Sequence, residues 1–250
     1  MTISPPTARK VTNHWPLISG LGALVVTVAL GLIIGFRQSP FVADTEWMED
    51  IVEHRSSYWE LPAFVMDYIG GHWIAVFLIP VGGAVLLYFL RGKWTALYYF
   101  VAAATSGAVV QLLKVSFGRS RPEDYLVAID SGSFPSGHTA NAATLSVTLA
   151  LIIGRWWPWV AGALYTVAMG LSRTYLGVHW VSDTVGGALV GAGVAFVLWA
   201  PFASRLKKEW AVRHPAEAHQ QTAAARPSPE KTAEEAEEAA EGTVADSVSP

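Results

Sequence analysis

The chain has 250 residues, of which 52% are hydrophobic and only 15% are charged, and its mean hydropathy is +0.35. Soluble domains carry about 25% charged residues, so this composition argues against a soluble domain and indicates a membrane protein. The sequence contains no cysteine, which excludes a disulfide, a zinc–thiolate site and a cysteine nucleophile. The net charge of −3 hides a segregation, because residues 1–213 carry a net charge of +3 and residues 214–250 a net charge of −6.

The first apolar run, Trp15–Phe36, has no charged residue over 22 positions, and about 20 such residues suffice to span a bilayer. Arg9 and Lys10 precede it, as in a signal peptide, but the apolar region of a signal peptide has about 7–15 residues. The run therefore predicts an uncleaved first membrane span. Residues 1–14 are expected to form a short cytoplasmic N-terminus.

Residues 37–72 are acidic and aromatic, with seven carboxylates. Trp47, Met48 and Ile51 recur at helical spacing, which is compatible with a short helix on the membrane surface. An extramembrane loop with a small local core fits the same residues, so the sequence leaves both interpretations open. In either case the segment is predicted to connect the first two spans on the extracytoplasmic side.

Five further apolar runs follow, each uncharged over 16 to 20 residues: Trp73–Leu90, Trp94–Leu113, Thr139–Gly154, Trp156–Ser172 and Thr184–Phe202. Tryptophans gather near the ends of the runs, as in the aromatic belt of a membrane protein. The six runs predict an all-α, polytopic membrane protein whose six transmembrane helices fill residues 15–202, with the active site carried by the bundle of the last four.

Residues 203–250 change character, because a few basic residues are followed by an Ala/Glu/Pro/Ser stretch with almost no large apolar side chain. Such a segment cannot bury enough surface to offset the entropy lost on ordering. We therefore predict a disordered, acidic cytoplasmic tail, with at most a fluctuating helix around Thr232–Glu241.

Three polar clusters, at residues 114–122, 134–138 and 172–183, lie at the ends of apolar runs. Chain direction alternates between successive spans, so six spans place all three clusters on one membrane face. The short turns on the other face carry Arg91, Lys93 and Arg155. The positive-inside rule then places both termini in the cytoplasm of a cell-membrane protein and the clusters on the extracytoplasmic face.

The third cluster contains His179 and Asp183, which are four residues apart and would share one face of a helix. A carboxylate bonded to one imidazole nitrogen fixes the tautomer and leaves the other nitrogen free for nucleophilic attack. An interfacial histidine beside an aspartate that starts a helix has the same spacing. The pair alone therefore does not decide between a nucleophile and a structural role.

The second cluster, Pro135-Ser136-Gly137-His138, opens the fourth predicted helix. Backbone amides at a helix N-terminus can bind an anion, and Gly137 allows its close approach. Ser136 can cap the helix or donate to a phosphate oxygen, and His138 stands where it could protonate a leaving oxygen. An ordinary serine-capped turn has the same pattern, so this signal is also weak alone.

Three cations, Lys114, Arg121 and Arg173, belong to the same predicted face. Arginine forks suit phosphate oxygens and lysine adds a point charge, and phosphoryl transfer needs chiefly positioning and charge stabilisation. A single lysine at this depth is more often an interfacial anchor, so the prediction of a phosphate site depends on the three clusters together. The sequence leaves Arg119 as either a substrate contact or a surface residue.

The clusters read Lys114-(six residues)-Arg121-Pro122, Pro135-Ser136-Gly137-His138 and Ser172-Arg173-(five residues)-His179-(three residues)-Asp183. In this order and spacing they resemble the three-part signature of the type 2 phosphatidic acid phosphatase superfamily, which also contains the vanadium haloperoxidases. The resemblance covers the third to sixth predicted spans.

The resemblance implies that His179 is a nucleophile forming a phosphohistidine, that Asp183 orients it and that His138 is the general acid. It further implies that the phosphoryl oxygens are held by the remaining signature residues, namely Lys114, Arg121, Ser136, Gly137 and Arg173. No metal and no other cofactor is implied, and the sequence shows no cluster of metal ligands.

The sequence therefore predicts an integral membrane lipid phosphatase acting on a phosphomonoester or diphosphate with its tail in the bilayer. Candidate substrates are an undecaprenyl-type diphosphate, phosphatidylglycerophosphate, phosphatidate and a decaprenyl-linked sugar phosphate. The alternative is a non-catalytic protein that binds or transports a lipid phosphate. A vanadate-dependent peroxidase is disfavoured, because the known ones are soluble. The expected partners are the lipid phosphate and membrane lipids, with no nucleic acid.

Overall fold

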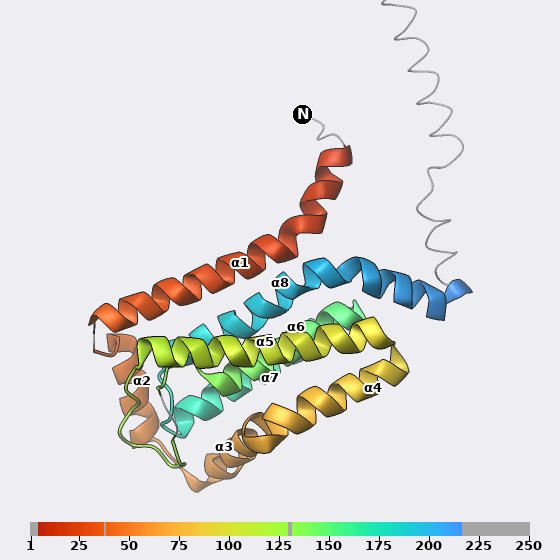
Figure 1. Ribbon diagram of the computed structural model, residues 1–250. Coiled ribbons are helices and arrows are strands. Elements are labelled where there is room, and N and C mark those ends of the chain that lie inside the picture. Colours follow the sequence, from red (N-terminus) through yellow and green to blue (C-terminus); the bar gives the residue numbers. More distant parts are fainter. Residues whose placement is uncertain (1–4, 38, 130–131, 217–250) are drawn as a thin grey trace, which may run out of the picture. The chain divides into compact units, whose positions relative to one another are not determined.

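The computed structural model describes residues 5–37, 39–129 and 132–216, and the side chains from His14 onward. Every regular element in these ranges is a helix, which confirms the all-α prediction (Figure 1). The elements are α1 (Pro5–Arg37), α2 (Val42–Glu53), α3 (Ser57–Gly70), the π-helix η1 (Ile74–Gly82), α4 (Gly83–Leu90), α5 (Lys93–Phe117), α6 (Gly137–Ile153), α7 (Trp157–Tyr175) and α8 (Val181–Arg213).

Each of the six predicted apolar runs coincides with helical structure, although not every helix has the length of a span. Among the described helices, three are long and apolar enough to cross a membrane: residues 14–37 of α1, α5 and α8. A fourth is obtained if α3 and the η1–α4 segment, which are bent by 60° relative to each other, count as one span. Helix α6 is apolar but shorter, so the structure supports three or four spans by length and composition.

Residues 37–72 differ from the predicted loop, because they form two helices. A short helix around Trp47, one of the two interpretations that the sequence left open, is present as α2, whereas α3 was not predicted. Glu60 and Asp67 interrupt the apolar pattern of α3, which hid this helix from a search for uncharged runs. The chain then turns at His72, where φ is 53°, and continues into η1.

The predicted disordered tail is wrong for residues 203–213, which continue α8. Leu206 is buried against Tyr98 and Ala102, and the guanidinium of Arg205 lies 4.8 Å from the centre of the Trp94 ring. These contacts pack residues 205 and 206 against α5, although the composition of this segment alone suggested no packing. The helix expected around residues 232–241 lies outside the described residues.

Small residues bring α8 against the beginning of α6. A Cβ atom on Gly187 would lie 2.3 Å from the carbonyl oxygen of Ser136, and one on Gly191 would lie 2.2 Å from that of Ala140. Only glycine allows an approach this close. The second and third clusters therefore meet where these two helices pack.

Helices α2 and α3 lie against the end of the molecule where α5 ends and α6 and α8 begin (Figure 1). Arg55, between the two helices, donates to the carbonyl oxygens of Asp124 at 2.5 Å and Tyr175 at 3.2 Å. The Tyr175 hydroxyl in turn donates to the carbonyl oxygen of Ser56 at 2.7 Å. Hydrogen bonds thus attach residues 37–72 to the third polar cluster and to the loop that follows the first one.

Candidate active site

His179 lies in the tight turn between α7 and α8. Gly177 makes this turn with a φ of +72°, and a Cβ atom there would lie 2.1 Å from the carbonyl oxygen of Asp124. Both the backbone conformation and the lack of space require glycine. The turn carries the His179 side chain inward, so that the residue is only 2% exposed.

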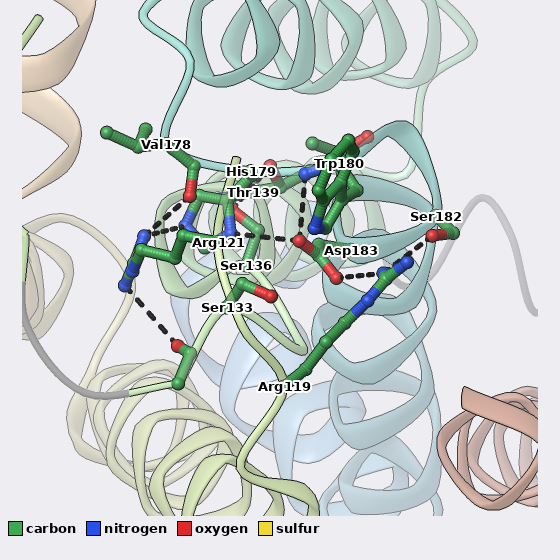
Figure 2. A network of polar contacts seen from close by, with 12 residues as sticks. Arg119, Arg121, Ser133, Ser136, Thr139, Val178, His179, Trp180, Ser182 and Asp183 are labelled. Atoms are coloured by element: carbon green, nitrogen blue, oxygen red, sulfur yellow. Dashed lines mark hydrogen bonds and ion pairs between the residues drawn. The ribbon is translucent and has the colours of Figure 1, made fainter. Parts of the chain in front are cut away.

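The two ring nitrogens of His179 face different partners (Figure 2). Nδ1 lies 3.6 Å from Oδ2 of Asp183, and Nε2 lies 3.4 Å from Nη1 of Arg121. The first distance is longer than a hydrogen bond, but a movement of about 0.5 Å would close it, and catalytic contacts often tighten only when substrate binds. The predicted pairing of His179 with Asp183 therefore has a matching geometry.

Asp183 is completely buried in the first turn of α8 and is held from two directions. Its Oδ1 accepts a hydrogen bond from Nη1 of Arg119 at 2.5 Å, and its Oδ2 accepts one from the main-chain N–H of Trp180 at 2.8 Å. The second bond leaves Oδ2 beside the imidazole. The carboxylate is thus fixed before any substrate arrives.

Arg119 is buried, so its interpretation as a surface residue is wrong. Its second guanidinium nitrogen binds Oδ2 of Asp44 at 2.8 Å, and it therefore bridges two carboxylates. Asp44, from α2, also accepts from the Ser182 main-chain N–H at 2.9 Å and hydroxyl at 2.6 Å. Buried charges need such partners, because an isolated ion away from water costs several kcal/mol.

The second cluster is attached to the third through its backbone. The main-chain N–H of Ser136 donates to the carbonyl oxygen of Asp183 at 3.0 Å. The Ser136 hydroxyl caps α6 by accepting from the Thr139 N–H at 3.5 Å and the Thr139 hydroxyl at 3.1 Å. This capping orients Gly137 and His138 at the first turn of α6.

His138 contacts α3 rather than standing alone. Its Nε2 lies 3.3 Å from Oδ1 of Asp67 and 3.2 Å from the Asp67 carbonyl oxygen. The same carboxylate oxygen accepts a hydrogen bond from the guanidinium of Arg173, near the end of α7. Asp67 therefore joins residues of two clusters.

Lys114 and Arg121 converge on one acceptor. The ammonium of Lys114 donates to the carbonyl oxygen of Gly132 at 2.6 Å, and Nη2 of Arg121 donates to the same oxygen at 3.3 Å. Nη1 of Arg121 also donates to the Val178 carbonyl oxygen at 2.6 Å, which places the guanidinium next to His179. Residues separated by two long helices are thereby brought together.

Burial keeps His179 uncharged. Loss of water and, after it, the positive charges of Arg173, Arg121 and Lys114, with His138 contributing, lower the pKa of His179 well below its usual value of 6.5. The imidazole is therefore neutral at physiological pH and keeps a lone pair for attack. Of these cations, Arg121 contacts the ring directly, and Lys114 shares an acceptor with Arg121.

The contacts described above connect the three predicted clusters, and the structure adds two residues to them. Asp44 and Asp67 were not identified, because the sequence shows only that residues 37–72 are acidic. That surplus of carboxylates on the same predicted face as the cations was the one available signal. Within the described residues, no group of three or more His, Cys, Asp or Glu side chains could hold a metal ion.

A neutral, buried histidine, a carboxylate behind it and three cations around it can bind a phosphate and attack its phosphorus. The fold and the site are thus those expected of a membrane protein that acts on phosphate esters.

Comparison with known proteins agrees with this class. The model of the PAP2 superfamily matches residues 95–206, which include all three clusters. Phosphatidylglycerophosphatase B of Bacillus subtilis (strain 168) is 31% identical over 153 residues, covering 57% of this chain and 74% of that protein. Undecaprenyl-diphosphatase of Sulfolobus acidocaldarius is 38% identical over 77 residues, covering 31% of this chain and 34% of that protein.

A solved structure is also similar. The crystal structure of the first transmembrane PAP2 type phosphatidylglycerolphosphate phosphatase from Bacillus subtilis matches with a TM-score of 0.65 and 25% identity, covering 75% of this chain and 96% of that chain. The chain belongs to the PAP2 superfamily, as its three clusters predicted. Its homologues are lipid phosphatases, and it is accordingly a phosphoric ester hydrolase.

Proposed function

We propose that this protein is a multi-pass membrane phosphatase that hydrolyses a lipid phosphomonoester or diphosphate through a phosphohistidine on His179. The observation that carries the proposal is the setting of this side chain, which is buried, neutral and placed between Asp183 and Arg121. Names of relatives such as phosphatidylglycerophosphatase and undecaprenyl-diphosphatase support a phosphorylated lipid as substrate.

In the first step, Nε2 of His179 attacks phosphorus while Nδ1–H points to Asp183. The N–P bond forms, the bond from phosphorus to the lipid oxygen breaks, and its electron pair stays on that oxygen. This oxygen takes a proton from His138 and leaves. Asp183 stabilises the positive charge that appears on the phosphorylated imidazole, because its carboxylate is 3.6 Å from Nδ1.

The remaining phosphoryl oxygens need positive partners during this step. In the proposal these are the signature residues Lys114, Arg121 and Arg173, together with Ser136 and the amide of Gly137 at the beginning of α6. The carbonyl oxygen of Gly132 and the carboxylate of Asp67, which now accept hydrogen bonds from the cations, would give way to phosphate oxygens.

In the second step, a water molecule attacks phosphorus and gives a proton to His138. The N–P bond breaks, its electron pair returns to Nε2, and inorganic phosphate leaves. Both histidines are then back in their starting states, and no other reactant is consumed.

We further propose six membrane spans, with the active site extracytoplasmic and both termini cytoplasmic. The six apolar runs and the basic turns at residues 91–93 and 155 support this arrangement. The absence of cysteine makes a direct test simple, because single cysteines can be placed at the exposed positions Glu123 and Arg155. In intact cells a membrane-impermeant maleimide should label Glu123→Cys and spare Arg155→Cys, and the reverse would overturn the orientation.

The activity is tested with the purified full-length protein and a panel of lipid phosphates, beside His179→Ala and His138→Ala. If the wild type releases phosphate and both variants do not, the proposal is supported. With a substrate labelled in the transferred phosphate, rapid quenching without acid should leave label on the wild-type protein, as the phosphohistidine. Unchanged turnover by His179→Ala would exclude the mechanism. Binding of lipid phosphates without release of phosphate would favour the alternative of a binding or transport protein.

A further inference from the structure

The phosphate side of the candidate site contains a carboxylate that the signature does not include. Asp67 is buried, and its Oδ1 contacts both the Arg173 guanidinium and Nε2 of His138 at 3.3 Å. It comes from α3, outside the region that the family model matches. A carboxylate repels an anionic substrate, so its presence in a proposed phosphate site needs an explanation.

The charges around His179 separate into two groups. Behind Nδ1, Arg119 is matched by Asp44, which leaves Asp183 to balance the charge that develops on the imidazole. In front of it stand the three cations of the signature, from which Asp67 subtracts one charge. Asp67 thereby lowers the positive charge that the phosphate side offers to a substrate.

A phosphomonoester carries a charge of about −1.5 to −2 at neutral pH. A diphosphate ester carries at least one more negative charge, and that charge lies on the leaving group. The leaving oxygen of either substrate must approach the nitrogen of His138 that gives it a proton. With Nε2 as that nitrogen, which lies 3.3 Å from Oδ1 of Asp67, the leaving group comes to lie against the carboxylate.

The two leaving groups respond differently to this neighbour. When a phosphomonoester is cleaved, the electron pair of the broken P–O bond stays on an alkoxide oxygen, which His138 neutralises with its proton. When a diphosphate is cleaved, the leaving group is a lipid phosphate that stays anionic after it takes the proton. Only the second is repelled by the carboxylate in every state along the step.

We propose that Asp67 is a specificity-determining residue that makes this enzyme prefer lipid phosphomonoesters over lipid diphosphates, an inference that rests on the proposed function. It acts through charge on the leaving-group side. A carboxylate that only oriented Arg173 and His138 would change the rates of both reactions alike.

The test uses two substrates with the same tail, farnesyl monophosphate and farnesyl diphosphate, and initial rates of phosphate release by the full-length protein. The wild type should show the higher kcat/KM for the monophosphate. Asp67→Asn should lower the ratio of the two kcat/KM values by about tenfold or more, because one negative charge disappears from a partly desolvated site. Asp67→Glu, which retains the charge, should stay close to the wild-type ratio even if both rates fall.

Asp44→Asn is the matched control, since Asp44 is also a buried carboxylate paired with an arginine, but on the Asp183 side. It should lower both rates in parallel and leave the ratio unchanged. A wild-type preference for the diphosphate, or an unchanged ratio in Asp67→Asn, would overturn the inference while leaving the proposed function intact. If Asp67→Asn does not fold, the ratio of the two kcat/KM values of the wild type decides the inference alone. If the wild type released phosphate from no lipid phosphate at all, the proposed function itself would fail.

Discussion

Two carboxylate–arginine pairs of similar chemistry flank the candidate active site and differ in what surrounds them. Asp44–Arg119 has side chains that are 2% and 6% exposed, and its arginine continues to Asp183. In Asp67–Arg173 the carboxylate is 13% exposed, and its neighbour is His138. Both acids come from the N-terminal helices α2 and α3, and both arginines belong to the clusters around the site.

The difference shows how one interaction can serve two purposes. The Asp44 pair is closed, because both carboxylate oxygens of Asp44 and both terminal guanidinium nitrogens of Arg119 already have hydrogen-bond partners, and nothing in the proposed reaction exchanges with them. The Asp67 pair can exchange partners, because in the proposed reaction a phosphoryl oxygen takes the place of Asp67 on the Arg173 guanidinium. We therefore expect the first pair to contribute mainly to stability and geometry, and the second mainly to binding and selectivity.

The largest effect is expected at the residue between the two pairs. His179→Ala removes the proposed nucleophile, and loss of such a group lowers turnover by about 10⁴-fold or more. Phosphate release from a lipid phosphate by the purified variant measures this. His54→Ala, which changes an exposed histidine before α3, is the control and should retain wild-type turnover. Residual turnover within tenfold of the wild type in His179→Ala would show that neither pair flanks the reacting group.

The two arginines should separate stability from binding. Arg119→Ala leaves Asp44 and Asp183 buried without their cation, which should cost about 3–5 kcal/mol of folding free energy and lower kcat. Thermal unfolding in detergent and steady-state kinetics would be measured on the same preparations. Arg119→Lys, which restores a charge, should recover part of both losses.

Arg173→Ala should show the opposite balance. Asp67 retains some exposure to water, so the loss of stability should be smaller, whereas KM should rise because a phosphate partner is missing. Equal loss of stability in Arg173→Ala and Arg119→Ala would contradict the distinction between a closed and an exchanging pair.

A smaller effect is expected at the turn that presents His179 to both pairs. Gly177→Ala places a Cβ atom against the carbonyl oxygen of Asp124 and strains a left-handed backbone, at a cost of about 1–3 kcal/mol. The displaced turn should lower kcat more than it raises KM. Gly154→Ala, also at positive φ but with open space around it, is the control for backbone strain alone. If both variants lost kcat equally, the contact with Asp124 would not matter.

The smallest effect is a shift along the pH axis. Cations near His179 lower its pKa, so Arg121→Gln removes one of them and raises that pKa. Because attack needs the neutral imidazole, the acid limb of kcat/KM should move to higher pH. Lys93→Gln, at the exposed beginning of α5, should leave the limb in place. A limb that stayed fixed in Arg121→Gln would mean that the limb does not report His179.

How far the sequence reaches can be judged at particular residues. Spacing alone identified His179 and Asp183 as a pair, since four residues near a helix start keep two side chains within reach. Family membership was also predictable, because three short clusters in a fixed order carry it. The bent segment from α3 to α4 was not predictable, since α3 contains Glu60 and Asp67 and the chain bends by 60° after it.

The sequence could not predict the ion pairs formed by three residues, Arg119, Asp44 and Asp67. Nothing local distinguishes Arg119 from Arg121, two positions away, or Asp44 and Asp67 from the five other carboxylates of residues 37–72. Which acid reaches which arginine depends on how α2 and α3 pack against α5, α7 and α8.

The sequence by itself therefore determined the membrane character of this protein, its family and the eight residues proposed to act on phosphate. The membrane character depends on composition, and the family and the eight residues depend on three short motifs in a fixed order, whose roles the resemblance implies. Only the tertiary structure decided which buried charges are paired, because Asp44 meets Arg119 across 75 positions and Asp67 meets Arg173 across 106. Pairing over such separations is set by helix packing, which no local pattern records.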